Sequence, residues 1–255
     1  MDPSSFPFPL QQDHADKLFQ ESGIPKDVSR AVAWTIEDKG VASKILNLPP
    51  ESLPERGIVF DFGAGYSRIR WDEPRVRPDG SEAKYDSPTG ARSQHYDPPI
   101  LREPVEDGSR TLFITEGEKK TLAMRVAGLA AIGIPGVDML HDAAIREETG
   151  ETILREAIKP LAANRPTSLV LDNDVDRKDQ VMDALARNVR ILEDAGAIPH
   201  VTFLPYHAKD KIGADDEWGS RIEDAAGDAA RLEVLGQAQA GGRGRQVPQV
   251  PPRRH

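Results

Sequence analysis

Apolar and polar positions alternate in short blocks over the second half of the chain. Runs of strand length occur at TLFIT (111–115), AAIGI (130–134), SLVLD (168–172) and PHVTFLP (199–205). Stretches with helical spacing lie between them, at 117–128, 151–165 and 178–194. Strands that alternate with helices of this length are typical of βαβ units. The pattern therefore predicts a parallel sheet with helices on both of its faces.

The first half of the chain has shorter and more varied elements. Helical spacing is found at 18–22, 28–36 and 41–46. The runs GIVFDF (57–62) and YSRIRW (66–71) are rich in β-forming residues and are separated by Gly-Ala-Gly, which predicts a β-hairpin. Residues 75–99 are rich in Pro, Gly, Asp and Ser, so we expect mostly loop there.

These patterns predict an α/β fold in which a small helical and β-hairpin segment precedes a parallel-sheet domain. We expect a disordered N-terminus (1–10), the helical and hairpin segment (11–105), the parallel-sheet domain (106–219), a C-terminal helix rich in Ala and Glu (220–239) and a disordered Gly/Pro/Arg tail (240–255).

Composition narrows the class of protein. The net charge is -9 with a sequence pI near 5.2, which argues against a protein that coats nucleic acid non-specifically but allows an enzyme that acts on it. The absence of cysteine excludes disulfides, thiolate zinc sites and thiol nucleophiles. No run approaches the roughly 18 apolar residues that span a bilayer, and the N-terminus lacks signal-peptide features. We expect a cytoplasmic protein with no membrane contact.

Acidic residues follow three of the predicted strands. They are Glu116 after the first strand, Asp172, Asp174 and Asp176 after the third, and Asp215 and Asp216 beyond the last. Because the carboxyl ends of parallel strands meet at one edge of a sheet, we expect these carboxylates to lie close together. Carboxylates in such a cluster repel each other unless a cation neutralises them, and all-oxygen ligands favour Mg²⁺ or Mn²⁺.

Each acidic group also has a simpler interpretation. A Glu at a helix start, such as Glu116, complements the helix dipole. Asp-x-Asp-x-Asp is found in calcium loops, but an EF-hand needs Gly at its sixth position and usually Glu at its twelfth. Those positions hold Arg177 and Asp183, and a strand rather than a helix precedes them. Asp215 and Asp216 would also suit a helix N-cap.

TLFITEGEKKTLAMRVAGLAAIGIPGV followed by SLVLDNDVD resembles the Toprim domain that bacterial-type primases and topoisomerases share. The resemblance implies a metal site formed by Glu116, Asp172 and Asp174, with Asp176 matching the longer acidic run of topoisomerases. KDKIGADDEW is similar to a later Lys-containing acidic motif of primases, which implies roles for Lys211, Asp215 and Asp216. The closest likeness is to primase-like Toprim proteins of phages, plasmids and other mobile elements.

The likeness extends upstream of the Toprim motifs. GIVFDFGAGYSRIRWDEP and AKYDSP resemble the small subdomain that precedes Toprim in primases, where basic side chains would hold template or nucleotide phosphates. The residues expected to bind nucleotide or DNA are Arg68, Arg70, Lys84, Lys119 and Lys211. The simpler alternative for Arg68 and Arg70 is a solvated edge strand that arginines protect from aggregation.

The resemblance implies primase-like, metal-dependent nucleotidyl transfer on single-stranded DNA during replication, with Glu116 as ligand or general base. Single-stranded DNA, nucleoside triphosphates and a replicative helicase are the implied partners. The chain departs from replicative primases in lacking a thiolate zinc site and in carrying Lys120 where many have an acidic residue. A Toprim nuclease, a non-catalytic DNA-binding accessory of replication and an inactive degenerate copy are the alternatives.

Overall fold

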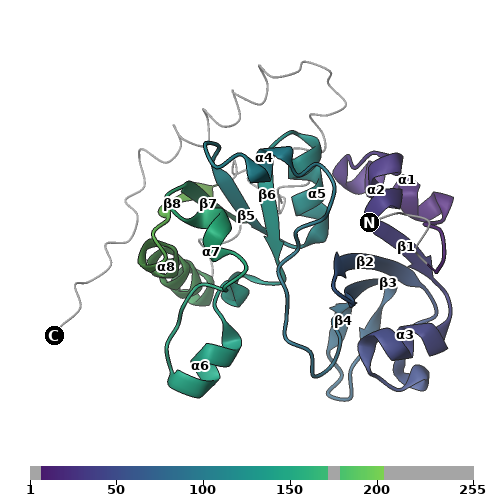
Figure 1. Cartoon of the computed structure of the whole chain (residues 1–255). Coiled ribbons are helices and arrows are strands. Elements are labelled where there is room, and N and C mark those ends of the chain that lie inside the picture. Colours follow the sequence, from purple (N-terminus) through teal and green to yellow (C-terminus); the bar gives the residue numbers. More distant parts are fainter. Residues whose placement is uncertain (1–6, 172–178, 204–255) are drawn as a thin grey trace.

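The computed structural model describes residues 7–171 and 179–203, and these form two four-stranded sheets (Figure 1). The first sheet has the order β1-β2-β3-β4 and the second the order β6-β5-β7-β8. The predicted C-terminal helix (220–239) and both predicted disordered ends lie wholly or mostly outside the described residues. The domain boundaries that the sequence suggests stay a prediction.

The first sheet is antiparallel throughout. Its strands are β1 (Ala33–Ile36), β2 (Gly57–Gly63), β3 (Tyr66–Val76) and β4 (Glu82–Asp86). The predicted hairpin of β2 and β3 is confirmed, and its turn consists of three residues with positive φ. Gly63 and Gly65 adopt this conformation without steric cost, which explains the Gly-Ala-Gly sequence.

Helices cover both faces of the first sheet (Figure 1). They are α1 (Gln12–Ser22), α2 (Lys26–Val32) and α3 (Lys39–Leu46), and a 3-10 turn, η2 (Pro50–Ser52), follows α3. One face packs on α3 through Trp34, Ile69 and Trp71. The other face packs on α1 and α2 through Ile58 and Phe60. The three predicted N-terminal helices are therefore present.

One prediction for this region is wrong, and a second one overlooks a strand. Residues 34–36 were expected to continue a helix, but they belong to β1, whose four residues are all buried beside β2. Residues 75–99 are mostly loop, as expected, but they also contain the end of β3 and all of β4, which the sequence did not predict. The polar segment pairs as a strand because Asp86 accepts hydrogen bonds from Trp71 and Arg75. Tertiary contacts thus override the local preference of both segments.

The second sheet is parallel throughout, as predicted. Its strands are β5 (Leu112–Glu116), β6 (Ala130–Ile134), β7 (Pro166–Leu171) and β8 (Ile198–Phe203). On one face, Phe113 and Ala131 pack with Met124 of α5 (Glu118–Val126). On the other face, Ile114 and Leu169 share a core with α8 (Asp179–Asp194). Helices therefore cover both faces, as the alternating pattern predicts.

The connections around this sheet are short. They include α4 (Glu103–Glu106), η3 (Val137–Met139), α6 (Ala143–Thr149) and α7 (Lys159–Ala162). The helix predicted over 151–165 is wrong except for α7. Gly150 ends α6 in the left-handed conformation, and His141 then pairs with Leu154 in a β-bridge. Arg155 donates to the backbone carbonyls of Met139 and Ser93, so tertiary contacts hold the segment in place of a helix.

The two sheets share a buried junction. Leu18 of α1, Phe60 of β2 and Leu122 of α5 belong to one core cluster. Tyr96, in the connection between the sheets, bridges Gly133 of β6 through two backbone hydrogen bonds of 2.7 and 2.8 Å. The first sheet is therefore packed against the second on the side of α5. None of the helices in the described ranges has the length and apolar character that crossing a membrane would require.

Candidate functional site

Glu116 lies at the carboxyl end of β5, in the interior of the parallel sheet. Glu116 is the register partner of Ile134 in β6, and the preceding Thr115 is the partner of Val170 in β7. The Glu116 side chain is exposed, in contrast to the four buried residues before it in the strand. Gly117 turns the chain into α5 with φ of 90°, a conformation that favours glycine. The turn therefore presents the carboxylate at the edge of the sheet.

The other predicted metal ligands lie outside the described residues. They are Asp172, Asp174, Asp176, Asp215 and Asp216, and the predicted phosphate-binding Lys211 lies there as well. β7 ends at Leu171, directly before Asp172 in the sequence, and is hydrogen-bonded to β5 along its length. The convergence of Glu116 with these aspartates stays a prediction. Within 7–171 and 179–203, no group of three His, Cys, Asp or Glu side chains could hold a metal ion.

A pocket of about 170 Å³ opens beside Glu116, and residues from both sheets line it. It is lined by Arg68, Tyr85, Glu116, Gly117, Glu118, Lys119, Lys120 and Pro135. The lining combines basic side chains from the antiparallel sheet and from α5 with the carboxylate at the end of β5. The arrangement is suited to an anionic ligand that also contacts Glu116 or a cation bound there.

Arg68 lies in this pocket with its position fixed on three sides. Its Nη1 donates to Glu118 Oε1 at 2.6 Å and its Nε donates to Ser87 Oγ at 3.1 Å. The guanidinium also lies over the ring of Tyr85, 5.3 Å from its centroid. Arg68 is 9% exposed, and β3 lies between β2 and β4. The solvated edge-strand interpretation of Arg68 and Arg70 is therefore wrong.

Arg70 lies two residues further along β3, on the same face as Arg68 and nearly buried. Its Nη2 donates to Glu21 Oε2 on α1 at 3.3 Å, and Lys119 Nζ donates to the same oxygen at 3.1 Å. The pKa of Lys84 is lowered by burial and by the charges of Arg70 and Lys119. The structure thus brings the predicted residues Arg70, Lys84 and Lys119 together at the junction of the sheets.

Sequence reasoning missed the contribution of α1 to this cluster. Glu21 lies 49 residues before Arg70 and 98 before Lys119, so no local pattern connects them. Burial raises the pKa of the Glu21 carboxyl, but Lys119, Arg70 and Lys17 outweigh burial and hold it below its ordinary value. Glu21 is therefore a charged carboxylate among basic groups.

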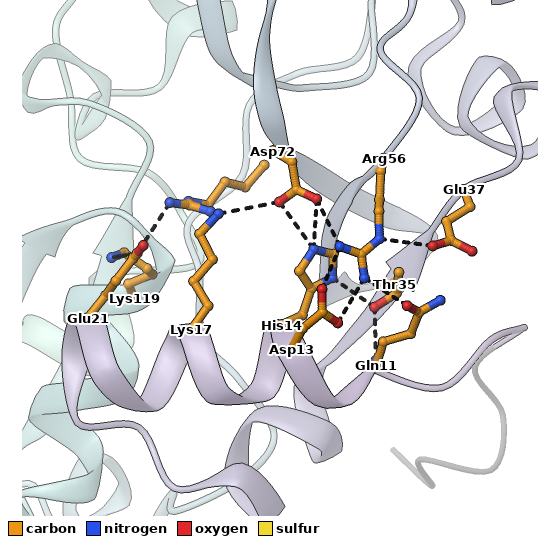
Figure 2. A network of polar contacts seen from close by, with 11 residues as sticks. Gln11, Asp13, His14, Lys17, Glu21, Thr35, Glu37, Arg56, Asp72 and Lys119 are labelled. Atoms are coloured by element: carbon orange, nitrogen blue, oxygen red, sulfur yellow. Dashed lines mark hydrogen bonds and ion pairs between the residues drawn. The ribbon is translucent and has the colours of Figure 1, made fainter.

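A second polar network ties α1 to the sheet next to this cluster (Figure 2). His14 contacts Thr35 Oγ1 through Nδ1 at 2.8 Å and Asp72 through Nε2 at 3.0 Å. Arg56 donates to Asp13 at 2.6 Å and to Asp72 at 3.3 Å. Burial lowers the pKa of His14, although Asp72 opposes the shift. The network fixes α1 on the sheet and so fixes the position of Glu21.

Comparison with known proteins gives a fold and a partial family match. A family model described as a domain of unknown function (DUF3854) matches residues 104–220. No curated protein sequence matches the chain. The crystal structure of the Aquifex aeolicus primase, comprising its zinc-binding and RNA polymerase domains, is similar with a TM-score of 0.55 and 15% identity. The similarity covers 89% of this chain and 56% of that one.

Two further primase structures show weaker similarity. The primase fragment of the bacteriophage T7 primase-helicase has a TM-score of 0.43 and 14% identity, with 91% of this chain and 81% of that chain covered. The RNA polymerase domain of the Mycobacterium tuberculosis primase also has a TM-score of 0.43, with 16% identity and 72% and 56% coverage. At such low identity, the likeness to the Aquifex aeolicus structure shows a shared α/β fold.

Proposed function

We propose that this chain is a primase-like protein of the Toprim type that catalyses metal-dependent nucleotidyl transfer on single-stranded DNA. The observation that supports the proposal most is the pocket in which the exposed Glu116 lies beside Arg68 and Lys119. An acidic group at the carboxyl edge of a parallel sheet suits a metal, and basic groups within reach suit phosphates. The primase-like fold agrees with this function.

The donor chemistry of the proposed site fits Mg²⁺ or Mn²⁺. Glu116 is an exposed carboxylate, and β7, which leads to Asp172 and Asp174, is the direct neighbour of β5. We propose Glu116, Asp172 and Asp174 as the principal ligands, with Asp176, Asp215 and Asp216 as further acidic groups. Bound divalent ions supply charge stabilisation to phosphoryl transfer and lower the pKa of an attacking hydroxyl.

The remaining residues of the pocket would bind and orient the phosphates. Arg70 and Lys84 would bind the phosphate chain of a nucleotide or of the template, with Lys119 and Lys211 as further contacts. Arg68 would orient the pocket, because Glu118 and Ser87 hold two of its three nitrogens in place. Glu116, if not a ligand, would accept the proton of the primer 3′ hydroxyl. Single-stranded DNA, nucleoside triphosphates and a replicative helicase are the proposed partners.

A Toprim nuclease is the second candidate, because the same acidic edge can promote attack by water on a phosphodiester. The cluster of basic side chains formed by Arg70, Lys84 and Lys119 favours synthesis, since a nuclease has no need for a triphosphate site. A non-catalytic accessory of replication would use this cluster alone.

One assay separates these functions. The protein is incubated with single-stranded DNA, labelled nucleoside triphosphates and Mg²⁺ or Mn²⁺, and both new strands and cut template are measured. Metal-dependent synthesis supports the primase-like function, and cleavage without synthesis supports the nuclease. Binding of DNA with neither product, by a folded protein under both metals, would support the accessory function and contradict catalysis.

A further inference from the structure

The carboxylate of Glu21 occupies the centre of the basic cluster. Its Oε2 accepts from Arg70 Nη2 at 3.3 Å and from Lys119 Nζ at 3.1 Å. Arg70 comes from strand β3 and Lys119 from helix α5, and Glu21 contacts both from a third element, α1. Figure 2 shows Glu21 on α1 beside Lys119. One carboxylate oxygen therefore serves two positive groups at once.

This contact satisfies only part of the hydrogen-bonding capacity of the Arg70 guanidinium. The residue is 3% exposed, and its Nε and Nη1 are buried with no hydrogen-bond partner in the part of the chain that the structure describes. Buried donors without acceptors cost free energy, and charged donors cost more than neutral ones. A guanidinium is built to bind two oxygens of a carboxylate or phosphate in parallel. Glu21 contacts only one nitrogen of Arg70, so the cluster could bind an anion with more acceptor oxygens.

Positive charge exceeds negative charge around Glu21. Lys84 and Lys17 add to Arg70 and Lys119, and the mutual repulsion of these groups, together with burial, lowers the pKa of Lys84. Lys17 also pairs with Asp72 at 3.4 Å. An anion with several charges would relieve the repulsion better than one carboxylate does.

The position of Glu21 allows its side chain to move away from Arg70 and Lys119. It is the penultimate residue of α1, directly before the Ser22 and Gly23 that end the helix. A negative charge near a helix C-terminus is unfavourable with the helix dipole, so the contacts with the cations must offset this cost. Its side chain is 38% exposed, whereas that of Lys119 is 17% exposed. A rotation of the Glu21 side chain towards solvent would open Arg70 without moving the helix.

We propose that Glu21 is an intramolecular competitor that occupies an anion site, and that phosphate groups bind this site by displacing the Glu21 carboxylate from Arg70 and Lys119. The inference rests on the proposed function in taking phosphate as the ligand. It adds that competition with the Glu21 carboxylate sets the affinity of this site for phosphate. The phosphate comes either from the polyphosphate chain of a nucleotide or from the backbone of a single strand.

The test measures binding and not activity. Binding of inorganic tripolyphosphate and of a single-stranded oligodeoxythymidylate is measured by calorimetry for the wild type and for Glu21→Gln. Removing the competing charge should tighten binding by about three- to tenfold for the ligand that uses the site, since ion pairs with one solvent-exposed partner are worth about 1 kcal/mol each. Asp16→Asn is the matched control, because Asp16 lies on the same helix and pairs with Lys26 away from the cluster. It should leave both affinities unchanged.

Lys119→Gln provides a second variant that does not depend on the first. It removes one of the two cations that contact Glu21 and should weaken binding, and in this background Glu21→Gln should give a smaller gain. A gain with tripolyphosphate alone identifies a nucleotide site, and a gain with the oligonucleotide alone identifies a strand site. Equal or weaker binding of both ligands by folded Glu21→Gln overturns the proposal. If Glu21→Gln binds phosphate more tightly but the wild type makes no primer, the inference about Glu21 stands and the proposed function is contradicted.

Discussion

Arg68 of β3 and Glu118 of α5 form an ion pair of 2.6 Å that joins the two sheets of the protein. The Glu118 side chain is 1% exposed, and it follows the proposed catalytic Glu116 by two residues. The pair therefore connects the basic face of the antiparallel sheet to the turn that carries Glu116.

Loss of one partner of this pair should be costly. In Glu118→Gln the guanidinium of Arg68 loses its charged partner, and an uncompensated buried charge costs about 3–5 kcal/mol. The free energy of unfolding, measured in urea, should fall by roughly that amount, with some relief because Gln can still accept a hydrogen bond. Glu106→Gln is the control, since its pair with Arg102 is exposed and should be worth about 1 kcal/mol or less. Equal effects of the two substitutions would contradict a structural role for the Arg68 pair.

Gly133 of β6 is expected to tolerate no side chain. A Cβ there would press into the hydroxyl of Thr121 and lie 3.1 Å from both the Gly117 carbonyl oxygen and Tyr96 Cβ. Gly133→Ala should therefore lower the free energy of unfolding by about 1–3 kcal/mol, the usual cost of overpacking, and disturb the Glu116 turn. Gly136→Ala is the matched control, because its nearest neighbour would be 3.7 Å away. Similar melting temperatures for the two variants would contradict the tight packing.

The stability of the protein should fall as the pH is lowered from 7 to 5. Burial lowers the pKa of His14, His95 and His141 below the ordinary value of 6.5. Between the lowered values and 6.5 the unfolded chain binds more protons than the folded one, so acid favours unfolding. Each histidine contributes at most about 1.4 kcal/mol per pH unit. Urea unfolding across this range checks the slope, which His14→Gln should reduce; an unchanged slope in that variant would exclude His14 as a contributor.

Binding of single-stranded DNA should depend on Arg70 and Lys84. If each holds one phosphate, Arg70→Gln and Lys84→Gln should each weaken binding and reduce the slope of log K against log salt by about 0.7. Arg77→Gln serves as the control, because Arg77 is exposed beyond the end of β3. Wild-type affinity and slope in the Arg70 and Lys84 variants would remove both residues from the proposed phosphate surface.

The parallel sheet was predictable because strong local patterns agree with its final packing. β5 and β7 are short apolar runs bounded by polar segments, and α8 keeps an apolar face through Leu185 and Leu192. β4 and β1 were not predictable in the same way. β4 is held by side-chain contacts of Asp86, and β1 exists because β2 lies beside it.

The candidate site was predictable only where its residues follow strands. Glu116 was found from its place after an apolar run, and the structure places it at the edge of the sheet. Glu21 and Lys17 were missed, because α1 reaches Arg70 and Asp72 only after the chain has folded. The contacts of Arg68 were missed for the same reason, since Glu118 lies 50 residues away.

Product formation by Asp174→Asn tests the central claim most directly. The substitution removes one ligand charge while keeping the size of the side chain, so thermal unfolding should show a folded protein. With single-stranded DNA, labelled nucleoside triphosphates and Mg²⁺, the wild type should extend strands and the variant should be slower by about a hundredfold or more. Asp183→Asn, an exposed position on α8, should match the wild type. Equal synthesis by Asp174→Asn and the wild type would contradict a metal-dependent centre at this edge of the sheet.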